Sequence, residues 1–165
     1  MRLSHFGDPS EFMDSLCVVP CGKKKIWESH PSRGAVSASE AYTGTFASAA
    51  RRYAERIYRG SWIVLSAKYG FLWPTDLVPG PYNVSFSRRG DPVICDAELR
   101  KQVEPLALSR FKQVVVVAGK AYALATRRAF ADIDGVQIRC PLKGLHDMGS
   151  MIAKLNHATD AGLML

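Results

Sequence analysis

Residues 20–25 read Pro-Cys-Gly-Lys-Lys-Lys and come directly after the apolar residues 16–19. A glycine lets the backbone turn sharply, and neighbouring ammonium groups attract phosphate. The run lacks the G-x-x-x-x-G-K-[ST] pattern of a P-loop, so ATP hydrolysis is not expected. The alternative interpretation is a solvated basic turn. The residues expected to contact an anionic substrate here are Cys21, Gly22, Lys23 and Lys25.

A second group of chemically capable side chains follows the apolar residues 62–65. The carboxylate of Asp76 can stabilise an oxocarbenium-like sugar or activate water. The ring of Tyr82 can stack on an extruded base, and the carboxamide of Asn83 can read a base edge. The alternative is a structural loop ordered by its prolines, with Asp76 capping a turn. Further residues expected to contact the substrate are Ser66, Lys68, Tyr69 and Gly70.

A third group, His146 and Asp147, follows a weaker apolar segment at residues 136–138. His146 is a candidate general acid or hydrogen-bond donor to a leaving base. Asp147 is the reserve for the catalytic carboxylate. The alternatives are a structural or solvated histidine and an aspartate that caps the last helix.

The four cysteines give no sign of a metal site. Cys17, Cys21, Cys95 and Cys140 form no C-x-x-C pair and no Cys/His cluster with zinc-finger spacing. Cys17 lies among apolar residues and is expected to pack like a small hydrophobic side chain.

Length and charge narrow the class of protein. A chain of 165 residues has the usual size of one domain, so residues 1–165 are expected to form a single α/β domain. It has 22 Lys and Arg against 15 Asp and Glu. The net charge of +7 favours an anionic partner, such as nucleic acid or a phosphorylated small molecule, over charge scattered for solubility. No apolar run approaches the roughly 20 residues that span a bilayer. Residues 1–9 contain no apolar signal region, so a cytoplasmic protein is expected.

Four apolar runs predict strands that position these groups. They are residues 16–19, 62–65, 114–118 and 136–138, and the first three are nearly continuous, as in parallel strands buried on both faces. Helices are predicted over residues 45–58, 96–108 and 120–130, with a last helix near residue 149. This alternation predicts a three-layer α/β fold: a mostly parallel central sheet of four or more strands, with helices on both faces.

Two segments do not fit the alternation, namely residues 22–44 and 69–92. Each follows a predicted strand directly, and long loops in compact domains are usually functional or disordered. Aromatic residues such as Trp27 and Tyr82 argue against disorder. Because ligands of such folds bind outside the carboxyl ends of the strands, we expect the two loops to form one site.

Parts of both loops resemble known families. Residues 66–82 resemble the S-x-x-Y-G-L-L-x-P-x-D-x-I-x-P-Y signature of the YaaA family, with Ser66, Tyr69, Gly70 and Asp76 in register. Two residues, Pro79 and Gly80, precede Pro81-Tyr82 where the YaaA signature has fewer. Residues 20–25 and 41–46 resemble the DUF6884 domain family, whose members carry a P-C-x-x-K run, a Y-x-G-x-x-F step and an S-A-K-Y-G-L motif. The resemblance covers about residues 17–86. A weaker similarity links residues 20–22 and 29–30 to archaeosine synthases, which act on a modified tRNA base.

These resemblances imply a uracil-DNA-glycosylase-like fold and the handling of nucleobases in nucleic acid. YaaA proteins are associated with DNA binding and oxidative-stress protection, and some small bacterial relatives resemble phage-defence glycosylases that remove bulky modified cytosines. The chain is much shorter than YaaA and lacks room for its extra DNA-binding helices. It also lacks the G-x-D-P-Y motif of uracil-DNA glycosylases, so the role of Asp76 rests on chemistry and not on a motif.

The resulting prediction is a DNA glycosylase that excises a modified base by hydrolysis of the N-glycosidic bond, which needs no cofactor. Asp76 would support the cationic sugar, while Lys23, Lys25 and Lys68 contact phosphate or the base and Tyr82 stacks on it. Two alternatives stay open. One is a non-catalytic DNA- or nucleotide-binding module in stress protection, and the other is an enzyme that modifies a tRNA base without cutting the sugar bond.

Overall fold

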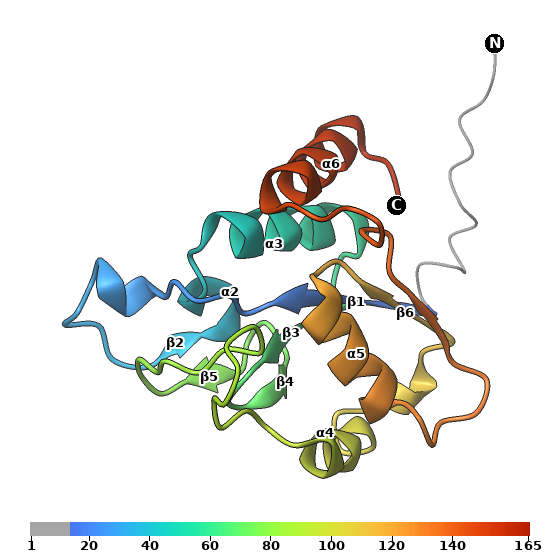
Figure 1. The fold of residues 1–165 in the computed structure, drawn as a ribbon, viewed down its shortest axis with the longest axis horizontal. Coiled ribbons are helices and arrows are strands. Elements are labelled where there is room, and N and C mark those ends of the chain that lie inside the picture. The colour runs from blue at the N-terminus through green and yellow to red at the C-terminus, as the bar shows by residue number, and fades with distance from the viewer. Residues whose placement is uncertain (1–13) are drawn as a thin grey trace.

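A five-stranded sheet forms the centre of the computed structural model, which describes residues 14–165 (Figure 1). Its strands are β1 (Ser15–Pro20), β3 (Trp62–Ser66), β4 (Gly70–Leu72), β6 (Gln113–Val116) and β7 (Gln137–Arg139). They lie in the order β4-β3-β1-β6-β7, and every pair is parallel except β3 with β4. All four predicted strands are confirmed. The expectation about a secretory signal concerns residues outside those described.

Burial explains why the central strands have continuous apolar sequences. All six residues of β1 are buried, because β3 and β6 flank it and helices cover the sheet. Cys17 is 0% exposed in this strand, so it packs as the small hydrophobic residue that was expected, and burial raises the pKa of its thiol. β4 was missed because it is a three-residue return strand that pairs antiparallel with β3 across a short turn.

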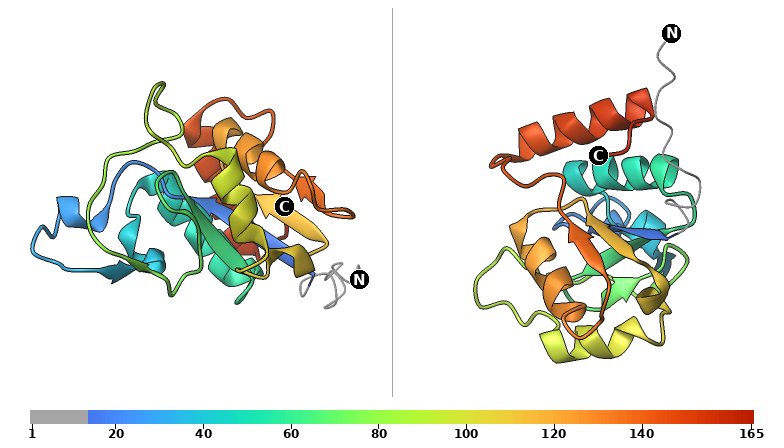
Figure 2. Two further views of the ribbon diagram at one scale, coloured as in Figure 1. Left: turned by 90° about the horizontal axis from the view of Figure 1, so that it is seen from below. Right: turned by 90° about the vertical axis from the view of Figure 1, so that its right-hand side faces the viewer.

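Helices cover both faces of the sheet, as Figures 1 and 2 show. Helix α3 (Thr45–Ile57) packs on β1, and α6 (Met148–Ala161) packs against α3. Helices α4 (Asp96–Val103) and α5 (Lys120–Ala129) pack together on the opposite face. The predicted α/β architecture, with a mostly parallel sheet between helices, is therefore confirmed.

One helix is shorter than predicted. The segment over residues 96–108 leaves the α-helix after Val103, because Pro105 has no N–H to donate and Ala107 adopts a left-handed conformation with φ of 57°. A short 3₁₀ helix, η2 (Leu108–Arg110), follows before β6.

A second, two-stranded sheet ties the two long loops together. β2 (Val36–Ser37) pairs antiparallel with β5 (Leu77–Val78), with Val36 opposite Val78. The first loop also contains η1 (Ile26–Glu28) and the single-turn helix α2 (Ala38–Ala41). These elements were not predicted, since two-residue strands carry no usable periodicity. They hold the loop after β1 against the loop after β3.

None of the helices between residues 14 and 165 is long and apolar enough to cross a membrane.

Candidate functional site

Tyr82 lies where the two long loops meet. Its hydroxyl oxygen is 2.7 Å from the hydroxyl of Tyr42 and 2.6 Å from Oγ of Ser66. Ser66 Oγ also accepts the backbone N–H groups of Lys68 and Tyr69, at 3.2 and 3.0 Å. Its acceptor capacity is then filled, so the Ser66 hydroxyl donates to Tyr82, which in turn donates to Tyr42. A hydrogen-bonded chain thus joins the end of β3 to both loops.

Lys25 is the buried member of the lysine run. It is only 3% exposed, whereas Lys23 and Lys24 are exposed, because an isolated β-bridge pairs its backbone with that of Tyr42. Its Nζ donates to the carbonyl of Lys23 at 3.0 Å and lies 4.3 Å from the centroid of the Tyr82 ring. No carboxylate among the described residues forms an ion pair with it. Burial lowers the pKa of this amine below its usual value.

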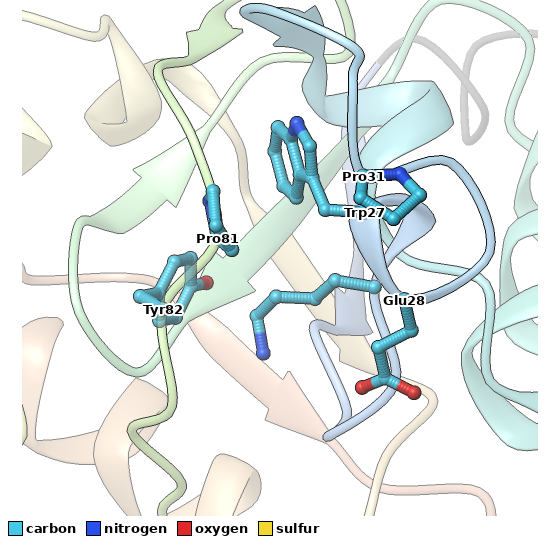
Figure 3. Close-up of a pocket in the computed structure, with 6 residues that line it drawn as sticks. Trp27, Glu28, Pro31, Pro81 and Tyr82 are labelled. Carbon is cyan, nitrogen blue, oxygen red and sulfur yellow. The ribbon is translucent and has the colours of Figure 1, made fainter.

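A cavity of about 190 Å³ opens beside this lysine. Its lining residues are Lys25, Trp27, Glu28, Pro31, Pro81 and Tyr82. Figure 3 shows Pro81 and Tyr82, from the second loop, facing the residues of the first loop across it. At roughly 30 Å³ per water the space corresponds to about six waters, which is the scale of one nucleobase ring. The lining combines two aromatic rings, one amine and one carboxylate.

Cys21 and Gly22 contact α5 and do not line the cavity. Cys21 is 0% exposed, with its Sγ 3.4 Å from the hydroxyl of Tyr122. The N–H of Gly22 donates to that same hydroxyl at 3.2 Å, and Gly22 adopts a positive φ of 65° that favours glycine. This turn fixes the direction of the lysine run.

The turn between β3 and β4 supports Tyr82 from the other side. The ring of Tyr69 packs edge-to-face on that of Tyr82, with 5.3 Å between centroids. Nζ of the exposed Lys68 lies 5.2 Å from the Tyr69 ring and 5.6 Å from the Tyr82 ring. Gly70 is buried against the amide of Gln102, which accepts the N–H of Phe71 at 2.9 Å and donates to the carbonyl of Tyr69 at 2.8 Å.

Asp76 and Asn83 are engaged in hydrogen bonds within their own loop. Oδ2 of Asp76 accepts the N–H of Trp73 at 2.7 Å, which closes the turn before β5. Oδ1 of the exposed Asn83 accepts from the guanidinium of Arg88 at 2.6 Å. Neither residue lines the cavity beside Lys25. Catalysis by Asp76 and base reading by Asn83 stay predictions.

His146 lines a different and larger cavity, of about 650 Å³, between α5 and the segment after β7. Three cations, Lys120, Arg127 and Lys143, line it with His146. Asp147 is exposed and caps α6, accepting the N–H and the hydroxyl of Ser150, each at 2.7 Å. These hydrogen bonds hold the pKa of Asp147 below its usual value. The structure therefore does not bring the third group into the cavity beside Lys25.

The described residues contain no group of three or more His, Cys, Asp or Glu placed to hold a metal ion.

The family to which this chain belongs follows from its match to a protein-family model. The model described as "Family of unknown function (DUF6884)" matches residues 16–157. The chain belongs to this family. This DUF6884 chain is similar to YfjM of Bacillus subtilis (strain 168), described as an uncharacterized protein, with 37% identity over 148 residues that cover 90% of this chain and 97% of YfjM.

Among solved structures, a distant likeness links the chain to the crystal structure of AF0587, described as a protein of unknown function. The TM-score is 0.31 at 15% identity, over 92% of this chain and 53% of the AF0587 chain. This chain thus spans about half the length of AF0587.

Several residues of this candidate site were not singled out from the sequence. Tyr42 was noted only within the Y-x-G-x-x-F step, and Trp27 only as an argument against disorder. No sequence pattern indicated Glu28 or Tyr122. Glu28 lies near Lys25 because of η1, and Tyr122 lies near Cys21 because of how α5 packs. The Y-x-G-x-x-F step was the one available pointer, since it places a tyrosine before the helix that follows the first loop.

Most tyrosine hydroxyls of this protein are buried, and burial makes them harder to ionise. It raises the pKa of five of the six tyrosines above 10.0, to about 12 for Tyr42 and Tyr53. The five are Tyr42, Tyr53, Tyr58, Tyr82 and Tyr122. Above pH 10 the unfolded chain releases phenolic protons that the folded chain retains. We therefore expect the free energy of unfolding to fall steadily as the pH rises above about 10.

Tyrosinate absorbance and circular dichroism, followed together from pH 8 to 13, measure this effect. Most of the tyrosinate signal should emerge together with loss of structure and not before it. Ionisation of most tyrosines near pH 10 with the fold intact would contradict the burial of these hydroxyls.

Proposed function

We propose that this DUF6884 protein is a DNA glycosylase that excises a modified nucleobase at the cavity beside Lys25. One observation carries the proposal: a buried amine, two aromatic rings and a carboxylate line one base-sized cavity where the loops after β1 and β3 meet. Ligands of parallel α/β folds bind at this edge of the sheet.

The cavity offers the groups that cleavage of an N-glycosidic bond requires. An extruded base can stack on the rings of Trp27 and Tyr82, which lie on opposite loops. Lys25 faces the leaving base and stabilises the charge that develops on it. A carboxylate supports the oxocarbenium-like sugar and orients the attacking water. The geometry favours Glu28 over Asp76 for this role, because Glu28 borders the cavity while Asp76 closes a turn.

A second group of cationic side chains, at the same edge of the sheet, would bind the phosphate backbone of the DNA. Lys120, Arg127 and Lys143 line the larger cavity, which lies beyond the carboxyl ends of β6 and β7. No acidic side chain lines it, and the whole chain carries a net charge of +7. The affinity of such a surface for DNA rises with the number of phosphates that its cations neutralise. The DNA would lie across both cavities in the cytoplasm, with one base inserted beside Lys25.

The test is base release from synthetic DNA, in single- and double-stranded form. The resemblance to defence glycosylases makes cytosines with bulky substituents the first bases to try, with unmodified DNA as the control. We expect free base in the supernatant and an abasic site revealed by alkali. Binding of DNA without base release from any modified substrate would favour the non-catalytic module, and alteration of a tRNA base with its sugar bond intact would favour the tRNA enzyme.

A further inference from the structure

Lys25 supplies the one primary amine among the residues that line the cavity proposed to receive an extruded nucleotide. It borders the cavity although it is only 3% exposed, and its two lysine neighbours in the sequence are exposed. Simple attraction of phosphate does not require burial, since Lys23 and Lys24 already provide exposed charge. Burying a lysine has a cost that a covalent role would explain.

The contacts of Lys25 leave its nitrogen available to react. Nζ donates one hydrogen bond, to the carbonyl of Lys23, and forms no ion pair with any carboxylate of residues 14–165. The Tyr82 ring, whose centroid is 4.3 Å from Nζ, holds the nitrogen at the cavity and attracts it most strongly in its ammonium form. Ser66 and Tyr42 fix that ring in turn through its hydroxyl.

We propose that Lys25 attacks C1′ of the abasic sugar left after base release, so that the same site also acts as an abasic-site lyase. This inference rests on the proposed glycosylase function, whose product is its substrate. Nζ adds to the aldehyde carbon of the ring-opened sugar and water leaves, which forms an iminium between Nζ and C1′. The Glu28 carboxylate, which borders the cavity, takes a proton from C2′, and the electron pair left on carbon expels the phosphate oxygen from C3′. Water hydrolyses the imine and returns the amine.

The surroundings of Lys25 favour the neutral amine that this attack needs. Burial is the main cause that lowers its pKa, and the positive charge of Arg88 lowers it further. Cys21 and Glu28 act in the opposite direction. Enzymes activate nucleophilic lysines by the same desolvation. The rate of imine formation should therefore rise with pH below the range in which an exposed lysine loses its proton.

The experiment uses a DNA duplex that already contains an abasic site, so it does not depend on knowing the modified base. Protein and DNA are mixed with sodium cyanoborohydride, which adds hydride to C1′ of the imine and leaves a stable secondary amine. We expect a covalent adduct whose mass is that of protein plus the abasic strand less one oxygen atom, and peptide mapping should locate it on Lys25. In Lys25→Met, which retains the length of the side chain, the adduct should be lost to background. Lys101→Met is the matched control, because Lys101 is an exposed lysine of α4 that lines neither cavity, and it should form the adduct as the parent does.

Mapping on the parent protein keeps the proposal falsifiable even if Lys25→Met does not fold. An adduct located on Lys23, Lys24 or Lys68, or no adduct at any pH, overturns the lyase inference. Failure of the two proposals is distinguishable. Base release without a trapped adduct removes the lyase and leaves the glycosylase, whereas an adduct on Lys25 without base release from any modified DNA removes the glycosylase and leaves the lyase.

Discussion

Replacing Glu28 with glutamine is expected to slow base release by about 100-fold or more, the usual loss when a catalytic acid or base is removed. Glutamine retains the size and hydrogen bonding of the side chain but lacks the negative charge that stabilises a cationic sugar. Glu28 is exposed and forms no salt bridge among the described residues, so the substitution should leave the fold unchanged. Single-turnover release of base from labelled DNA measures the rate, and DNA affinity should match that of the parent.

Asp76→Asn is the matched control for this experiment. The amide oxygen of asparagine can still accept the N–H of Trp73, now 2.7 Å from Oδ2, so the turn before β5 should persist. We expect base release near the parental rate. A slow Asp76→Asn protein beside a normal Glu28→Gln protein would assign the carboxylate to Asp76, as the sequence first suggested. If both variants retain the parental rate, Asp147→Asn is the next variant to measure.

The sheet of this protein could be predicted because its central strands are buried on both faces. Residues 16–19 and 62–65 have no alternation of apolar and polar side chains, and only parallel strands under helices bury such segments well. The predicted strands gave the carboxyl edge of the sheet and hence the position of the loops. What could not be predicted are the contacts between loops, such as β2 with β5, which depend on pairing between residues about 40 positions apart.

The location of the site could be predicted from the sequence, but the contacts among its residues could not. The lysine run indicated positive charge after β1, yet no local pattern distinguishes Lys25, which is buried, from Lys23 and Lys24, which are exposed. That difference arises from the bridge between Lys25 and Tyr42. Asp76 was attractive because a carboxylate can stabilise a cationic sugar, but the structure shows the alternative that the sequence also offered, in which Asp76 closes a turn by accepting the N–H of Trp73.

Gly70 of the S-A-K-Y-G motif should be the glycine least tolerant of alanine. It adopts a positive φ of 77°, and an added Cβ would lie 2.8 Å from Cδ of Gln102. That amide can move away only by breaking its hydrogen bonds to Tyr69 and Phe71. The left-handed conformation costs about 1–2 kcal/mol and the overpacking about 1–3 kcal/mol. We expect Gly70→Ala to lower the free energy of unfolding by about 2–5 kcal/mol, measured by urea denaturation.

Two further variants separate the cost of the left-handed backbone at residue 70 from the cost of overpacking. Gly90 has a positive φ of 86° but no heavy atom within 4 Å of an added Cβ, so Gly90→Ala should show only the conformational cost of about 1–2 kcal/mol. In a Gln102→Ala background the clash at Gly70 disappears, and Gly70→Ala should then cost about as much as Gly90→Ala. The coupling between residues 70 and 102 should thus be about 1–3 kcal/mol, as is common for residues in contact. Strictly additive losses would mean that the Gln102 amide does not occupy the space left by the missing Cβ.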